Sequence, residues 1–585
     1  MSENLLIRLV QTRNKDTLAL LGLGLAACGL LPARRKALAR LLRLPAPRYE
    51  VAVERNLAIP MPDGVALRAD HYFPRPAGSY PTILVRTPYG RGSAGGLLAQ
   101  GMAVLLTCFA ERGYHVLVQD TRGRFDSEGD FEPLTHEAAD GRATVDWLAG
   151  QPWFNGTLGM WGPSYLGYVQ WAVASAAPPP LKALVPIITF SRGYAAAYMD
   201  GAPALDLALN ALFLFDALGN RERPPRESRR RWRNREKILA PAFRHLPLLE
   251  ADRMAIGRAV PFYRSGALRP EPENPFWQAL DHHPAPEPAG PAVHLISGWY
   301  DLFLRDLLDD YALLRAAGRS PYLTIGPWYH MDLSWVPEAL RQGLAWFDAH
   351  LQGRRERLRE RPVRLYILGA DEWREMEAWP PPNPTTRLFL QPHGLLSPEP
   401  PADSPPDRYR YDPADPTPNL GGGLLFPPAG PVDNRPLEAR PDVLVYTTLP
   451  LKQDLEVIGP VRLQLYVRSS LAHTDFFGRL CDVHPSGRSI NICDGLFRIE
   501  PGKGERLPDG TLRIEVDMWA TACRFRRGHR LRLLVASGAH PRWARNLGTG
   551  EPAATATRMA VAEQEVYHDP EHPSALLLPG SGIRA

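Results

Sequence analysis

The chain has 585 residues and a mass of 65.1 kDa, more than one hydrophobic core normally holds, so we expect two or three domains. Apolar residues make up 44% and charged residues 22% of the chain, which excludes a disordered or fibrous protein. The formal net charge is +5, but residues 1–50 hold nine basic and three acidic side chains, so the rest of the chain is close to neutral. This distribution weakens any general claim of polyanion binding.

The cysteines and histidines give no sign of a disulfide framework or a metal centre. The five cysteines are scattered and odd in number. No CxxC pair occurs, and no group of histidines has the local spacing of zinc ligands. We therefore expect no metal and no organic cofactor.

The first 50 residues differ from the rest in charge and pattern. The apolar run over residues 18–31 is shorter than the roughly 20 residues that a membrane span needs. Residues 33–44 have the pattern of a basic amphipathic helix. We expect residues 1–50 to be a helical appendage. Three alternatives stay open: helices packed on the folded body, a peripheral or anchored membrane contact through residues 17–44, or a cleaved signal. The basic residues after the apolar run favour a cytoplasmic location, with or without membrane association.

Strands alternate with helical stretches over two parts of the chain, which predicts a mostly parallel sheet flanked by helices. Helices and loops rich in Ala, Leu, Arg and Pro separate the two parts, and only short β-patterned runs follow them. We therefore expect a body with a mostly parallel sheet in two parts (51–190 and 291–352), a helical insertion between them (191–290) and a C-terminal all-β sandwich or jelly roll (353–585).

The segment GPSYLG, residues 162–167, places Ser164 on a Gly-bounded turn between an apolar strand and the start of a helix. A sharp turn of this kind presents the serine nucleophile of α/β-hydrolases. The usual motif has glycine two residues after the serine, where this chain has Leu166, and Gly167 follows one position later. On this motif alone, an ordinary loop serine remains the alternative.

A serine nucleophile needs a base and an orienting carboxylate, which follow in α/β-hydrolases in the order Ser, Asp or Glu, His. Asp301 directly follows the apolar strand HLISGWY, and His330 directly follows LTIGPWY. Both side chains should lie at the carboxyl edge of the sheet, where such sites form. We therefore predict the triad Ser164–Asp301–His330.

Other acidic residues and histidines are weaker candidates for the triad. Asp120, together with the adjacent arginines, is expected to brace a loop near the site. The remaining candidates are Asp306, Asp309 and Asp310, on a helix face expected to be solvated, His294 inside a strand, His282 and His283 in a Pro-rich loop, and His350 on a helix.

An acyl-transfer enzyme also needs donors for the developing oxyanion. The backbone N–H of Tyr165, directly after Ser164, is one candidate. The phenol of Tyr89, in the turn RTPYGRG after an early strand, is the second. A tyrosine that merely packs at a strand end is the alternative for Tyr89.

Several long segments occur in an order that resembles the cocaine-esterase-like (CocE/NonD) hydrolases, which share their fold with Xaa-Pro dipeptidyl-peptidases. The segments include RTPYGR, QDTRGRFDSEGDF, QPWFNGTLGMWGPSYLGYVQW, ISGWYD and IGPWYH, and the resemblance runs from about residue 50 to the end. It implies an α/β-hydrolase body (a mostly parallel sheet flanked by helices), an inserted helical cap and a C-terminal all-β jelly roll, and its triad falls on Ser164, Asp301 and His330. It also implies an oxyanion tyrosine at Tyr89 and an acyl-pocket aromatic at Phe303, and its own pattern is G-x-S-Y-x-G.

Two properties of related enzymes have no counterpart in this sequence. Amino-ester hydrolases bind a substrate ammonium with acidic residues near the site, whereas Leu302 and Phe303 follow the predicted catalytic aspartate here. The dipeptidyl-peptidases also have an extra N-terminal domain, for which this chain has no room. Both points favour an esterase or amidase over an aminopeptidase.

We therefore expect a serine hydrolase that cleaves small-molecule esters, or amides, through an acyl-enzyme intermediate. An Xaa-Pro-type dipeptidyl-peptidase is the alternative, and a non-catalytic ligand-binding protein is a more remote one. Residues 221–237 carry nine basic and three acidic side chains, which is typical of a solvated helix face, so no nucleic-acid partner is expected. No oligomeric state is predicted.

Overall fold

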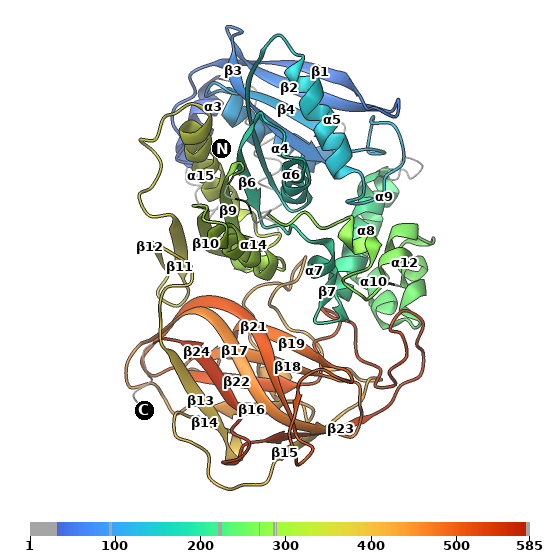
Figure 1. Cartoon of the computed structure of the whole chain (residues 1–585), viewed down its shortest axis with the longest axis vertical. Helices are drawn as coiled ribbons and strands as arrows, with labels where there is room; N and C mark the ends of the chain where they lie inside the picture. The colour runs from blue at the N-terminus through green and yellow to red at the C-terminus, as the bar shows by residue number, and fades with distance from the viewer. Residues whose placement is uncertain are drawn as a thin grey trace.

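The structure is a computed structural model that describes residues 32–92, 96–219, 225–267, 269–284, 287 and 289–580. The apolar run over residues 18–31 lies outside the described residues. Figure 1 shows a sheet with its helices at one end of the molecule, a second body of strands at the other end, and a group of helices beside their junction.

The first sheet has ten strands in the order β1-β2-β4-β3-β5-β6-β9-β10-β11-β12. Strands β3 to β6 and β9 to β11 are parallel, and β1, β2 and β12 pair antiparallel at the edges. A parallel sheet is covered on both faces, and every residue of β4 is accordingly buried. The bounds are β1 (Glu50–Pro60), β2 (Ala66–Arg75), β3 (Tyr80–Thr87), β4 (His115–Asp120), β5 (Phe154–Pro163), β6 (Leu181–Ile187), β9 (Ala292–Tyr300), β10 (Tyr322–Tyr329), β11 (Val363–Ile367) and β12 (Glu372–Met376).

Helices cover this sheet on both faces. Phe109 of α4 packs edge-on against Phe347 of α15 at 5.8 Å. Gly343 of α15 lies so close to Trp161 of β5 that a Cβ there would be 2.9 Å from the indole. The helices α5 and α6 form the opposite layer, and α14 packs on β9. The bounds are α4 (Gly96–Ala110), α5 (Glu137–Ala149), α6 (Tyr165–Ser175), α14 (Leu304–Ala316) and α15 (Val336–Leu351).

Between β6 and β9 the chain forms the expected helical insertion, which has a small hydrophobic core of its own. This core includes Leu209 and Phe213, and Ala544 from the C-terminal region joins it. The elements are α7 (Gly193–Ala197), the hairpin β7 (Tyr198–Met199) and β8 (Ala202–Pro203), α8 (Leu205–Gly219), α9 (Pro225–Arg233), α10 (Arg235–Arg244), α11 (Ala251–Ile256), α12 (Pro261–Ala267) and α13 (Pro275–Gln278). We call this insertion the cap.

The C-terminal region is an all-β body, so the predicted fold class is confirmed. Its long strands alternate buried and less buried residues, as in β17. The bounds are β13 (Thr385–Gln391), β14 (Leu395–Ser397), β15 (Asp407–Tyr411), β16 (Leu444–Thr447), β17 (Leu455–Ser469), β18 (Thr474–Val483), β19 (Ser489–Ile499), β20 (Glu505–Arg506), β21 (Leu512–Phe525), β22 (Arg530–Ala536), β23 (Ala562–Tyr567) and β24 (Ala575–Pro579). We call this region the β-domain.

One strand assignment differs from expectation. The run VRLYI, placed above in the jelly roll, is β11, which pairs in parallel with β10 of the first sheet. Together with β12 it extends the first sheet beyond residue 352, where we expected the hydrolase body to end. Its alternation of apolar and polar residues fits an edge position in either sheet, so the sequence pattern could not assign it.

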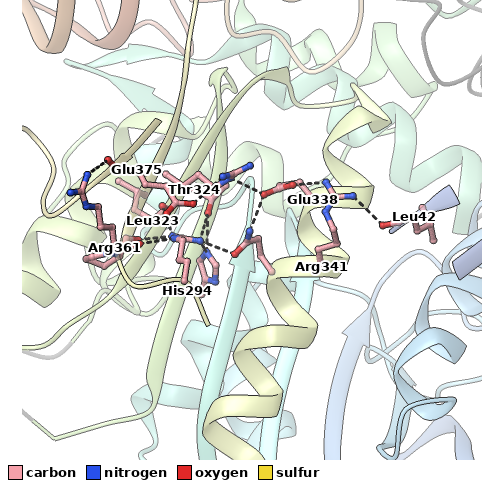
Figure 2. Close-up of polar contacts among 12 residues, drawn as sticks. Leu42, His294, Leu323, Thr324, Glu338, Arg341, Arg361 and Glu375 are labelled. Carbon is pink, nitrogen blue, oxygen red and sulfur yellow. Dashed lines mark hydrogen bonds and ion pairs between the residues drawn. The ribbon is translucent and has the colours of Figure 1, made fainter. Parts of the chain in front are cut away.

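A partly buried polar network fixes the segment that connects α15 to β11 (Figure 2). The guanidinium of Arg359 donates to Gln342 Oε1 at 2.7 Å, to Leu323 O at 2.9 Å and to Thr324 Oγ1 at 3.2 Å. His294 Nε2 lies 3.0 Å from the same threonine oxygen. His294 is therefore a fully buried strand histidine with a hydrogen-bond partner, as expected.

The N-terminal helix α3 (Pro32–Leu41) packs on the hydrolase body. Leu38 and Leu42 are buried in the main core, and Arg341 of α15 donates to Leu42 O at 3.0 Å. The apolar side of α3 thus contacts protein, in agreement with the packed-helix alternative for this part of the appendage. None of the helices in the described ranges is both long and apolar enough to cross a bilayer.

Candidate active site

Ser164 stands at the sharp turn between β5 and α6, with φ 57° and ψ −123°. A non-glycine residue in this region of the backbone map is strained by about 1–3 kcal/mol. The turn is held by Ser164 N–H, which donates to Ile187 O at 2.9 Å, and by the hydroxyl of Thr189, which donates to Ser164 O at 2.6 Å. The neighbouring strand end therefore fixes the strained serine.

The glycines on either side of Ser164 explain the unusual spacing of the motif. A Cβ on Gly162 would lie 2.4 Å from the Cβ of Leu166, and a Cβ on Gly167 would lie 2.4 Å from a methyl carbon of Thr189. Leu166, which occupies the position of the usual second glycine, is buried against Gly162. The close approach to Thr189 thus falls one residue later, at Gly167.

Asp301 and His330 come together because β9 and β10 end side by side. Tyr300 and Tyr329 are paired across these parallel strands, so the next residue of each strand lies at the same height. Gly298 allows this approach, because a Cβ there would lie 2.2 Å from Trp328 O.

The three predicted triad side chains form a continuous relay. The hydroxyl of Ser164 lies 3.0 Å from His330 Nε2, and His330 Nδ1 lies 2.7 Å from Asp301 Oδ1. The other carboxylate oxygen of Asp301 accepts a hydrogen bond from Ser297 Oγ at 3.0 Å. Asp301 is fully buried and His330 is 3% exposed, so the relay is shielded from water on the aspartate side.

The two predicted oxyanion donors meet at Ser164. The phenol of Tyr89 lies near the Ser164 side chain and the backbone N–H of Tyr165, and both act on its pKa. Burial raises the pKa of Tyr89 to about 12, so the phenol keeps its proton at neutral pH. The side chain of Tyr165 points elsewhere and donates to Glu137 Oε1 at 2.7 Å, which leaves only its backbone N–H for the site.

The loop that carries Tyr89 is braced by buried ion pairs, as expected for Asp120 and its neighbours. Arg91 contacts Asp120 and donates to Asp70 Oδ1 at 3.1 Å. Arg124 donates to Pro88 O at 2.8 Å. These contacts hold the turn on both sides of Tyr89 and do not reach the reacting atoms.

A cavity of about 210 Å³ opens from Ser164 and Tyr89 toward the cap. Phe303 is 4% exposed, lines this cavity and packs edge-on against the His330 ring at 5.2 Å. None of the described residues that line the cavity carries a charged side chain. Sequence reasoning missed most of them, among them Leu207, Leu212, Phe215, Phe262, Tyr263 and Trp277 from the cap.

The β-domain also contributes to the cavity wall. Leu425 and Ala554 line the cavity, and Gly423 is so close to the start of α14 that its Cβ would lie 3.2 Å from Leu302 Cα. The hydroxyl of Tyr300, next to Asp301, donates to Asn491 O at 3.1 Å. The hydrolase body, the cap and the β-domain therefore all meet at the site.

The expectation that Asp306 and Asp310 lie on a solvated helix face is wrong. Both are buried, and both bind the segment after β6: Asp306 accepts from Ser191 N at 2.7 Å and Asp310 from Ser191 Oγ at 2.7 Å. Burial raises the pKa of Asp310 well above its usual value. Their spacing of four residues also suits a helix face packed on a loop, which the sequence pattern cannot distinguish from a solvated one.

Comparison with known proteins identifies the family to which this architecture belongs. Residues 63–332 match the X-Pro dipeptidyl-peptidase (S15) family, and residues 358–577 match the C-terminal non-catalytic domain of X-Pro dipeptidyl-peptidases. The chain is 34% identical over 571 residues to a cocaine esterase of Rhodococcus sp. (strain MB1 Bresler), covering 90% of this chain and 98% of that protein. The chain belongs to the cocaine-esterase-like (CocE/NonD) hydrolases. It is a serine hydrolase of the CocE/NonD type.

Two solved structures share the fold. An aminopeptidase from a Thaumarchaeota archaeon aligns with a TM-score of 0.74 at 24% identity, over 91% of this chain and 96% of that one. An α-amino acid ester hydrolase aligns with a TM-score of 0.72 at 22% identity, over 91% and 97%. Both structures are similar to this chain in fold alone. The substrate class of this chain must therefore be inferred from its own site.

We predict that Gly298→Ala lowers kcat/KM by at least about tenfold and destabilises the protein by about 1–3 kcal/mol, because the added methyl forces apart the strand ends that carry Asp301 and His330. The matched control is Gly101→Ala in α4, where a Cβ meets no atom within 4 Å; it should leave activity unchanged and stability equal or slightly higher. Ester hydrolysis and thermal unfolding measure both effects. Equal behaviour of the two variants would contradict the proposed strand-end constraint.

Proposed function

We propose that this CocE/NonD hydrolase cleaves uncharged carboxylic esters with an apolar acyl group, with Ser164 as nucleophile, His330 as general base and Asp301 as its orienting carboxylate. The observation that carries the proposal is the Ser164–His330–Asp301 relay opening onto a cavity without charged lining among the described residues. The cocaine esterase relative, named for an ester substrate, supports the same choice.

The geometry supports the following first step. His330 Nε2, 3.0 Å from Ser164 Oγ, takes the hydroxyl proton as the oxygen attacks the carbonyl carbon. Asp301, buried and 2.7 Å from Nδ1, fixes the imidazole tautomer and stabilises the imidazolium. The Tyr89 phenol and the Tyr165 N–H donate to the oxygen that becomes negative.

In the second half of the catalytic cycle these roles are reversed. His330 returns its proton to the leaving alcohol, which departs and leaves an acyl group on Ser164. Water enters, His330 removes its proton, and the same two donors stabilise the second oxyanion. The carboxylic acid is released and Ser164 is regenerated, so the chain's own residues suffice for the cycle.

The cavity indicates the acyl group. Its volume of about 210 Å³ exceeds the roughly 150 Å³ that binds benzene in a dry apolar cavity of another protein. Phe303, Phe215 and Leu212 line it, so we propose that it takes an aromatic or medium-length aliphatic acyl group.

The same cavity disfavours substrates with a free amino group, which the aminopeptidase alternative needs. A buried ammonium without a partner is strongly unfavourable. The adjoining cavity does contain charges, from Asp206, Arg305, Asp306 and Arg542, but it measures only about 40 Å³. Its carboxylates and guanidinia balance, and Arg542 is already paired with Asp494. We therefore assign no amine-binding role to it.

We also propose that α3 and the residues up to 44 serve to pack the appendage on the hydrolase body. Leu38, Ala39 and Leu42 are buried there, and Arg35 pairs with Glu111 at 2.5 Å. A membrane contact would have to use residues other than these.

We expect a fluorophosphonate probe to label wild-type protein on Ser164 and to leave Ser164→Ala unlabelled. The chain offers a matched control in the β-domain, where Ser404 Oγ lies 2.8 Å from His568 Nδ1 and His568 Nε2 lies 3.1 Å from Asp407. Ser404 does not line the apolar cavity, so Ser404→Ala should be labelled like wild type. Peptide mass spectrometry locates the adduct, and labelling retained in Ser164→Ala would refute the mechanism.

Replacing Tyr89 by phenylalanine should lower kcat about 10²–10³-fold with little change in KM, because the lost phenol acts mainly on the transition state. Tyr263→Phe is the control, since Tyr263 also lines the cavity but its hydroxyl donates to Leu248 O at 2.7 Å. Steady-state kinetics on a p-nitrophenyl ester would report the difference. A kcat of Tyr89→Phe within threefold of wild type would remove Tyr89 from the oxyanion site.

Two p-nitrophenyl esters that differ only in a charged group test the substrate class. At pH 7 the phenylacetate should be cleaved with a kcat/KM up to about tenfold above that of the α-aminophenylacetate, because the uncharged cavity favours the neutral amine, which is the minor form at that pH. A Gly-Pro anilide, measured alongside, should be a still poorer substrate. Preference for the amino ester or for the anilide would favour the aminopeptidase alternative.

A further inference from the structure

A second group of potential ligand side chains lies in the β-domain, at the end of β18. Val483 of β18 is paired with Arg530 of β22 in an antiparallel register, so the residues just beyond them, His484 and His529, lie opposite each other. Asp482 is two residues before His484, and side chains two apart along an extended strand share a face. The topology thus gathers one carboxylate and two imidazoles on one side of this strand pair.

The distances within this group suit a common ligand. His529 Nδ1 lies 2.8 Å and 3.0 Å from the two oxygens of Asp482, and His484 Nε2 lies 3.7 Å from one of them. One ligand atom from each of the three side chains lies within 4.8 Å of the others. Ligand atoms of a tetrahedral zinc site are about 3.3 Å apart, so shifts of a few tenths of an ångström to about an ångström would close this group around an ion.

Burial makes part of the site rigid and leaves part of it open. The side chains of Asp482 and His529 are 9% and 12% exposed, whereas that of His484 is 40% exposed. The backbone around His484 is a tight turn, in which Gly487 N–H donates to His484 O at 2.8 Å. Two ligands are therefore already placed, the third can turn toward them, and solvent can supply a fourth.

The donor set and the surrounding charge decide which ion fits. Two imidazoles with one carboxylate favour Zn²⁺, Cu²⁺ or Ni²⁺ over Ca²⁺ and Mg²⁺, which prefer oxygen ligands. Arg488 and Arg526 lie near enough to act electrostatically on His484. Their positive charges oppose a cation, so the affinity should be moderate, with a dissociation constant on the order of micromolar.

We propose that Asp482, His484 and His529 form a three-ligand site for a zinc-class divalent ion that fastens the end of β18 to the start of β22. None of the three residues lines either cavity near Ser164, so the site is separate from the ester chemistry. Local spacing could not reveal it in the sequence, because His529 is supplied by a distant strand.

The test uses the full chain, freed of metal by a chelator and then titrated with Zn²⁺ in a calorimeter. We expect one zinc per chain in wild type, and binding weakened by on the order of 100-fold in His484→Ala. A parallel titration with Co²⁺ should give visible d–d absorption in wild type that His484→Ala lacks. Thermal unfolding should rise with added Zn²⁺ in wild type but not in the variant.

Two further variants keep the outcome clear. Asp482→Asn preserves the shape of the side chain and removes its charge, so it should weaken zinc binding as His484→Ala does. The same loss in both variants would show that poor folding of one of them is not the cause. His473→Ala, a histidine of the same domain outside the group, should bind zinc like wild type. The proposal is overturned if wild type binds no zinc, or if His484→Ala and Asp482→Asn bind it with wild-type stoichiometry and affinity.

Discussion

The strained backbone of Ser164 is the constraint on which the rest of the site depends. With φ at 57°, the residue remains in place only because Ile187, Thr189 and the close-packed Gly162 and Gly167 leave its turn no other conformation. The strain turns the serine oxygen out of the sheet edge toward His330. Every other feature of the site is arranged around that oxygen: the relay behind it, the donors beside it and the cavity in front of it.

Different segments of the chain supply the triad geometry and the cavity walls. The parallel sheet aligns the ends of β9 and β10, and this alignment places Asp301 beside His330. The cap and the β-domain add apolar walls to the cavity. This separation explains how one hydrolase body can serve both esterases and peptidases, because the catalytic geometry and the charge of the cavity reside in different segments.

The sequence predicted the hydrolase body and the candidate triad residues because strand-end residues are readable: apolar runs end abruptly in Ser164, Asp301 and His330. It did not predict the cavity, whose walls come from Ala- and Leu-rich helices with no distinguishing pattern, such as α8. It misassigned Asp306 and Asp310, because a buried helix face that binds a loop has the same acidic spacing as a solvated one. The run that forms β11 was placed in the wrong sheet, since alternation fixes which face of a strand is buried but not its neighbour.

The contribution of Leu425 and Ala554 to the cavity has a consequence for how the protein acquires its activity. The proposed triad lies within the first 330 residues, but the cavity wall is completed by residues more than 90 positions later in the chain. A chain still emerging from the ribosome can therefore fold its sheet and assemble its relay before it can enclose a substrate. The closed cavity therefore forms only once the β-domain has docked on the hydrolase body and the cap.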